Sequence, residues 1–230
     1  MICLLLFAAA AGYSQTVVPD PALQERQPPP PAPQHKRILG IIPNYRTSPT
    51  LKDYKPISSG EKFKIFAQDA FDPGSFMLAG LFAGKGYLDN DTPSFGRGVG
   101  SFGKYYAAGY GDVAIGDLMT EAFYPVILHQ DPRFFRRGTG SIWSRARYAV
   151  GQIFWTRSDS KQMQFNYSEV AGNATAAAIA TAYYPDNRTV GAVASQAGIQ
   201  LGIDMAGNLL KEFWPDLDRK LSRKFHAKDP

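Results

Sequence analysis

The chain has 230 residues, a formal net charge of +5, 20% charged residues and 13% aromatic residues. This length suits one sizeable domain or at most two small ones, and the apolar content excludes a disordered chain. The mild basic excess suits an anionic surface. It is too small for a dedicated nucleic-acid-binding protein, so we expect no nucleic-acid partner.

Residues 1–15 have the pattern of a signal peptide. The apolar stretch Ile2–Gly12 precedes small residues where a signal peptidase could cut, for example after Ser14; a buried N-terminal helix is the alternative. The sole cysteine, Cys3, lies in this segment, so the cleaved chain would offer no thiol for a disulfide, a zinc site or catalysis. We therefore expect an exported protein, in the periplasm or associated with the outer membrane.

Residues 16–36 form a Pro-rich segment that includes four consecutive prolines, so we expect a disordered tether. A helical domain is then expected over residues 37–216. It starts with the short β-branched run Arg37–Tyr45, which is either a strand or an apolar segment laid across the domain; we favour the second.

Three helix starts carry local capping signals. Ser58 and Glu61 have capping-box spacing, Asp72 precedes a proline suited to the first helical position, and Ser141 follows a Gly-Thr-Gly turn. Between the last two, Gly100–His129 has a long apolar stripe that we expect to bend near Pro125.

Two further helices are expected towards the C-terminus. One starts at Asn166, again with Glu three residues later, and the other covers Thr189–Asp216. A Phe-Trp-Pro-Asp motif at 213–216 predicts that the second helix ends or bends sharply there. Residues 217–230 would then form a basic amphipathic tail that rests on an anionic membrane or docks on the bundle.

Small residues recur at four-residue spacing in these last helices, so they share one helix edge. Glycine inside a helix costs about 1 kcal/mol relative to alanine, which close backbone contact can offset. We therefore predict helix packing along Gly172, Ala176, Ala180, Ala194, Gly198, Gly202 and Ala206.

The polar residues Asp204, Gln196 and Gln200 interrupt the longest apolar pattern. An aspartate at the centre of a bilayer costs about 2.5–3.5 kcal/mol, and a span needs roughly 20 apolar residues. The predicted fold class is therefore all-α, a compact multi-helix bundle that is soluble or lies on a membrane. If Asp204 is buried it needs a partner such as a Tyr hydroxyl, Arg145 or Arg147.

Arginines concentrate in the segment from His129 to Arg147. Guanidinium groups match the geometry of phosphate and carboxylate, and backbone amides of a Gly-Thr-Gly-Ser turn could add donors. The predicted anion-binding residues are Arg133, Arg136, Arg137, Ser141, Arg145 and Arg147. The alternative is a solvated basic loop paired with scattered Asp and Glu.

Two weaker catalytic patterns are present. His129 could act as a general base oriented by Asp131, or Asp131 could cap a turn while His129 closes a helix end. Asp117 and Glu121 share a helix face and could run glycoside hydrolysis if held across a cleft, although a shared helix face is more often structural. With three histidines in the chain, we expect neither a metal site nor a cofactor.

The motifs HQDPRFFRRGTGSIWSR, FNYSEVAGN, AYYPD and LLKEFWPD together resemble a family of uncharacterised exported bacterial envelope proteins. The resemblance covers roughly residues 37–216. It implies an envelope location and a mostly helical domain, and it brings no known activity or catalytic residue.

Three functions remain open at this point. The leading hypothesis is a non-enzymatic envelope protein, peripheral or membrane-associated, that contacts anionic lipid or glycan through the Arg-rich segment. The second is a hydrolase of envelope polymers that uses His129 and Asp131 or the Asp117/Glu121 pair. The third is a scaffold subunit with envelope protein partners.

Overall fold

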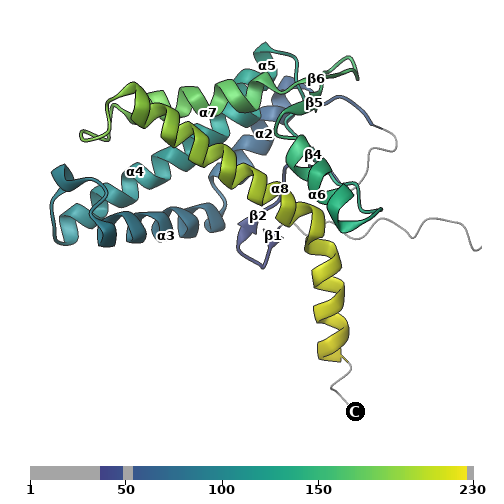
Figure 1. Ribbon diagram of the computed structural model, residues 1–230, viewed down its shortest axis with the longest axis horizontal. Helices are drawn as coiled ribbons and strands as arrows, with labels where there is room; N and C mark the ends of the chain where they lie inside the picture. The colour runs from purple at the N-terminus through teal and green to yellow at the C-terminus, as the bar shows by residue number, and fades with distance from the viewer. Residues whose placement is uncertain (1–36, 49–53, 227–230) are drawn as a thin grey trace, which may run out of the picture. The chain divides into compact units, whose positions relative to one another are not determined.

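The computed structural model describes residues 37–48 and 54–226, and of 222–226 only the helical backbone (Figure 1). The predicted signal peptide and Pro-rich tether lie outside the described residues. The prediction of a mostly helical fold is confirmed. The α-helices are α2 (Ser59–Ala70), α3 (Pro73–Asp89), α4 (Val99–Asp117), α5 (Tyr124–Ile127), α6 (Ile142–Gly151), α7 (Tyr167–Ala180) and α8 (Val190–His226).

Shorter elements connect them. A 3₁₀ turn, η1 (Pro93–Phe95), precedes α4, and a π-helical turn, η2 (Leu118–Phe123), joins α4 to α5. The described strands pair in twos: β1 (Arg37–Ile38) with β2 (Ile42–Pro43), β3 (Thr47–Ser48) with β4 (Phe134–Phe135), and β5 (Trp155–Arg157) with β6 (Met163–Phe165). The β3–β4 pair is parallel and the other two pairs are antiparallel.

The predicted helix starts follow from their caps. Ser58 and Glu61 form the complete capping box of α2, and Asp72 accepts the backbone N–H of Gly74 at 2.7 Å at the start of α3. Ser141 accepts the amide of Ser144 at the start of α6. Asn166 does the same for the amide of Glu169 at the start of α7. Each bond satisfies a backbone donor that the first helical turn leaves free.

The helices pack in sequence, with α3 on α4, α4 on α7 and α7 on α8, while η2 lies between α2 and α7. Many of the buried apolar residues are alanines, which let helices approach closely. These alanines are Ala70, Ala79, Ala83, Ala108, Ala122, Ala149, Ala176, Ala177 and Ala180.

The small-residue edges behave differently in the last two helices. In α7, a Cβ added at Gly172 would lie 2.8 Å from the side chain of Thr120 and 3.1 Å from the backbone of Met119, so the backbones are in close contact. In α8, the four small residues are exposed, and a Cβ at Gly198 or Gly202 would meet nothing within 4 Å. The predicted packing along Ala194, Gly198, Gly202 and Ala206 is therefore wrong, because this edge of α8 faces away from α7.

Two predicted boundaries also differ from the structure. Residues 37–43 form a hairpin rather than an apolar segment laid across the domain, and Ile38 alone among them is fully buried. At the other end, α8 continues through Pro215 to His226, so residues 217–226 extend the same helix. Proline removes one helical hydrogen bond, and α8 changes direction towards its C-terminal end in Figure 1.

The expected irregularity near Pro125 takes the form of η2. The backbone N–H of Tyr124 bonds to the carbonyl of Met119, five residues earlier, which widens the turn just before the proline. The wide turn places Thr120 and Glu121 inside the bundle, where both are buried. Within residues 37–48 and 54–226, no helix combines the length and apolar character that a bilayer crossing requires.

Candidate functional site: a basic and aromatic surface on α6 and α8

The Arg-rich segment folds as β4, a loop and α6. Gly138 and Gly140 in the loop have φ angles of 69° and 103°, a region that side chains disfavour. The loop thus turns sharply enough for Ser141 to cap α6, as predicted. Three of the five arginines in the segment, Arg133, Arg136 and Arg145, then pair with carboxylates of the chain.

Arg145 is held by α8. Its Nε donates to Glu212 Oε1 at 2.7 Å and its Nη2 to the Glu212 backbone carbonyl at 2.8 Å, while its guanidinium lies 4.4 Å from the centre of the Phe213 ring. The same Glu212 carboxylate accepts the backbone amides of Arg137 and Gly138. Glu212 therefore fixes both the loop and α6 against α8.

Arg133 is occupied in a similar way. Its guanidinium makes hydrogen bonds to both carboxylate oxygens of Asp131, the shortest at 2.7 Å, and lies against the rings of Tyr54 and Phe135. Asp131 also accepts a hydrogen bond from the Tyr54 hydroxyl. Burial raises the pKa of Tyr54, and the negative charge of Asp131 raises it further, which keeps this hydroxyl a donor.

Arg136 donates to the Glu212 carbonyl and pairs with Asp216 at 3.3 Å. Arg133, Arg136 and Arg145 therefore pair with carboxylates of the chain itself. This is the alternative to the anion binding that we predicted for them. Arg137 and Arg147 are exposed, and neither forms an ion pair within the described residues. These two remain free to meet an anion.

Exposed apolar side chains accompany these two arginines. On α6, Ile142 is 71% exposed and Trp143 is 79% exposed, and on α8 Leu217 and Leu221 are 47% and 44% exposed. We define the α6–α8 surface as Arg137, Ile142, Trp143, Arg147, Leu217, Arg219, Lys220 and Leu221.

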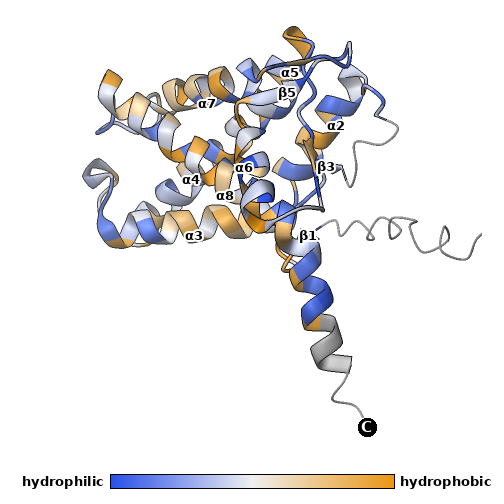
Figure 2. Ribbon diagram, turned by 45° about the vertical axis from the view of Figure 1, so that its right-hand side comes forward, coloured by the Kyte–Doolittle hydropathy of each residue, from blue (hydrophilic) through white to orange (hydrophobic). Residues whose placement is uncertain are grey.

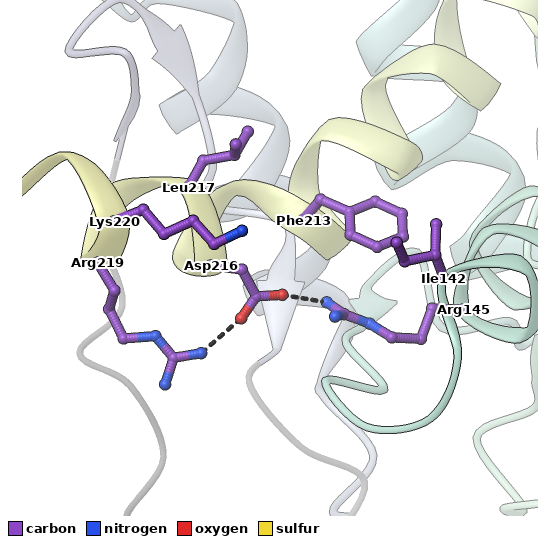
Figure 3. A pocket seen from close by; sticks show the side chains of 7 residues that line it. All are labelled: Ile142, Arg145, Phe213, Asp216, Leu217, Arg219 and Lys220. Carbon is purple, nitrogen blue, oxygen red and sulfur yellow. Dashed lines mark hydrogen bonds and ion pairs between the residues drawn. The ribbon is translucent and has the colours of Figure 1, made fainter.

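A shallow groove joins the two helices of this surface (Figure 3). Ile142, Phe213 and Leu217 line it on the apolar side, and Arg219 and Lys220 add positive charge. At the groove, Asp216 pairs with both Arg145 and Arg219. Blue and orange residues alternate along the C-terminal part of α8 in Figure 2, as expected of an amphipathic helix.

The two candidate catalytic residues next to the Arg-rich segment do not form a pair. His129 has a left-handed φ of 52° and an 82% exposed side chain, and its Nδ1 lies 3.8 Å from Asp159. Asp131 is buried and engaged by Arg133 and Tyr54. The structure therefore does not orient His129 through Asp131, and the geometry of a general base with its carboxylate is absent.

The Asp117/Glu121 pair is also unlike a hydrolytic site. The structure buries Glu121 at 3% exposure, beside Arg46. Burial raises the pKa of Asp117 and of Glu121 well above their usual ranges, and their acidic neighbours raise both further. Glu121 is enclosed by the bundle, so the pair is not held across an open cleft where a polymer could bind.

Asp204 is close to α7 rather than to the Arg-rich segment. It accepts a hydrogen bond from the Asn173 side-chain amide at 3.0 Å, and the charge of Arg46 acts on it. The suggested pairing of Asp204 with Arg145 or Arg147 is therefore wrong, because Arg145 is bound to Glu212.

Sequence reasoning missed Glu212 and Arg46, which organise the two polar networks. Glu212 carried no local signal, because its partner Arg145 lies 67 residues away. Arg46 carried none, because its partners lie 75 and 123 residues away.

Among the described residues, no group of three or more His, Cys, Asp or Glu is placed to hold a metal ion. Comparisons of the chain with protein-family models, with curated proteins and with solved structures find no match.

Proposed function

We propose that this chain is a non-enzymatic protein of the bacterial cell envelope that binds anionic lipid headgroups peripherally through the α6–α8 surface. The observation that carries the proposal is Trp143, 79% exposed on the first turn of α6 beside Ile142, with Arg147 one turn further along the same helix. Tryptophan favours the boundary between lipid headgroups and acyl chains, and arginine binds phosphate.

Charge and shape support a lipid over a glycan. The groove between α6 and α8 is lined by apolar side chains next to Arg219 and Lys220. An interfacial helix buries its apolar face while basic residues meet the headgroups, and each basic residue near an anionic surface contributes about 1 kcal/mol. An acidic glycan would use the arginines and leave Ile142 and Leu217 without a role.

The envelope location rests on the predicted signal peptide and on the resemblance of the four motifs to exported bacterial proteins. Peripheral rather than integral association is consistent with the lack of a candidate span among the described helices. The envelope location and the peripheral association do not assign a reaction to the chain.

Vesicle flotation tests the proposal. We expect the purified chain to float with vesicles that contain phosphatidylglycerol, to bind phosphatidylcholine vesicles weakly, and to be released by salt. The double variant Arg137→Ala/Arg147→Ala should bind anionic vesicles at least about tenfold more weakly, since tenfold corresponds to about 1.4 kcal/mol.

The matched control is Lys104→Ala/Arg188→Ala, which removes the same charge from two exposed positions on other elements. Equal losses in the two double variants would reduce the effect to net charge and contradict the proposed surface. Binding to soluble acidic polysaccharide with no vesicle binding would replace lipid by glycan.

A second candidate is a scaffold role, which the uncharged face of α8 favours. Exposed Val190 and Ile199 flank the edge that contains Gly198 and Gly202, so another helix could approach this face closely. Light scattering after size exclusion tests it: Gly198→Leu should abolish self-association, and a monomeric parent chain at high concentration would remove the self-assembling form of this idea.

A further inference from the structure

A second polar network lies inside the bundle, centred on Arg46. The Arg46 side chain is 13% exposed, and its Nη2 lies 2.5 Å from Glu169 Oε2 and its Nη1 3.5 Å from Glu121 Oε1. Its Nε donates to the carbonyl of Pro132 at 2.6 Å. One guanidinium therefore connects the β2–β3 turn with η2 and α7.

Three oxygens in this network accept no hydrogen bond although they are buried: Asp69 Oδ1, Glu121 Oε2 and Glu169 Oε1. The residues Glu121 and Glu169 are 3% and 1% exposed. A buried acceptor without a donor is costly, so each of these oxygens requires a hydrogen.

Neighbouring carboxyl groups can supply that hydrogen. Glu121 is close enough to donate a hydrogen bond to Asp69, which would favour the charged form of Asp69. Asp204 is close enough to donate to Glu169 in the same way. A proton shared by two carboxyl groups satisfies both oxygens at once, as in pairs of acids that cannot both ionise.

The charge count leads to the same conclusion. Five carboxyl groups act on one another here, and the two cations that act on them are Arg46 and Lys211. Unbalanced buried charge is costly, so this excess of carboxyl groups over cations favours protonated carboxyl groups in the folded chain. The five are Asp69, Asp117, Glu121, Glu169 and Asp204.

The electrostatics agree with the geometry. Burial raises the pKa of Asp204 to about 7, with a further contribution from the charge of Glu169. Burial likewise raises the pKa of Asp69, Asp117 and Glu121, although Arg46 and Lys211 oppose the change.

We propose that this core is a proton-binding site, with one proton shared by Asp69 and Glu121 and another by Glu169 and Asp204, and that losing them loosens the bundle. Each pair joins two elements, α2 to η2 and α7 to α8, so deprotonation places two negative charges across each contact. The device makes the packing of these helices sensitive to pH.

The remaining polar groups around the network do not supply the hydrogens that the unpaired oxygens of Glu121 and Glu169 need. The Tyr45 backbone amide donates to Asp69, and the Asn173 side chain donates to Asp204. Tyr110, on α4, is also near this network. Burial raises the pKa of Tyr110, and the negative charge of Asp117 raises it further. None of these groups donates to the free oxygens of Glu121 or Glu169 within the described residues.

The test is the unfolding equilibrium of the whole chain as a function of pH. Folded-state pKa values above the unfolded ones mean that the folded chain holds extra protons, so stability is present at low pH and is lost as pH rises through the folded pKa. We expect the unfolding constant to increase by about tenfold per pH unit for each extra proton held, from the unfolded carboxyl pKa near 4 upward, and the contribution of Asp204 to level off near pH 7, where Asp204 titrates in the folded chain.

Asp204→Asn and Glu121→Gln keep the shape and provide a permanent N–H donor to Glu169 or Asp69. We expect each to flatten the dependence by about one proton, that is about tenfold per pH unit, and to stabilise the chain at alkaline pH relative to the parent. Asp89→Asn, an exposed carboxylate paired with Lys85, is the control and should leave the dependence unchanged.

An unfolding constant that stays flat from about pH 5 to about pH 7 would overturn the proposal, as would a parent-like slope in both isosteric variants. If neither variant folds, the heat of unfolding of the parent in two buffers with different ionisation enthalpies counts the protons released. A count near zero also overturns it.

Discussion

Arg145 and Glu212 form a buried ion pair that joins α6 to α8, with Nε and Oε1 2.7 Å apart and the Glu212 side chain fully buried. The pair is 67 residues apart in sequence and sits beneath the α6–α8 surface. Its position implies that the exposed basic and aromatic residues rest on a rigid support rather than on a solvated loop.

We predict that Glu212→Ala destabilises the chain by about 3 kcal/mol, the lower end of the cost of breaking a buried ion pair, because Asp216 still pairs with Arg145. The change also leaves the amides of Arg137 and Gly138 without their acceptor. Urea denaturation followed by circular dichroism measures the loss. The double variant Arg145→Met/Glu212→Met should recover part of it, and additive losses would contradict the pairing.

A matched pair of glycine substitutions tests the helix contacts. Gly172→Ala should destabilise by about 1–3 kcal/mol, because the new Cβ would press on Met119 and Thr120 of η2. Gly198→Ala should instead stabilise by up to about 1 kcal/mol, because its Cβ meets nothing and alanine is the better helix former. Thermal unfolding of both variants measures the two changes in stability. A change in the same direction for both variants would contradict the prediction.

The start of α3 predicts a dependence on acid pH. Burial favours the neutral form of Asp72, but hydrogen bonds from Arg37, from the Gly74 amide and from Tyr45 outweigh it and lower the pKa. A lowered folded-state pKa gives stability that is present above the unfolded value near 3.9 and lost as pH falls through the folded pKa.

Asp72→Ala should therefore destabilise by about 1 kcal/mol or more at neutral pH, as expected for a lost helix cap. The difference from the parent chain should shrink in acid, where the parent loses its charged carboxylate. Urea titrations at a series of pH values follow this difference, and a gap that widens towards low pH would show that Asp72 stabilises in some other way.

Trp143 tests the membrane proposal separately from charge. Trp143→Ser should weaken binding to anionic vesicles by about tenfold, since about 1.4 kcal/mol of interfacial burial is lost, and should leave the salt dependence unchanged. Trp155, which is 54% exposed on β5, gives the control Trp155→Ser. Flotation measures both, and equal effects would argue against α6 as the contact.

The helix starts could be predicted because capping is local. Ser58, Asp72 and Ser141 each bond to an amide two or three residues away, so short sequence windows contain the whole interaction. The direction in which α8 faces could not be predicted in this way. Four-residue spacing shows that Gly198 and Gly202 share an edge, but not whether that edge is covered.

The candidate site was predicted at the level of the segment and not of the individual arginines. Which guanidinium is free depends on carboxylates far along the chain, such as Glu212 for Arg145 and Asp216 for Arg136. Arg133 is the exception, since its partner Asp131 is two residues away. Long-range ion pairs follow from the packing of helices, which the pattern of single residues does not specify.

Because α8 passes through Pro215 without ending, Asp204, Glu212 and Lys220 belong to one continuous helix. The basic end of the chain is consequently no detachable module. Cutting the chain back past Asp216 shortens the very helix that clamps Arg145, so such a truncation should first appear as a loss of cooperative unfolding. A force applied to the far end of this helix would likewise reach the contact between Arg145 and Glu212 through the continuous backbone of α8.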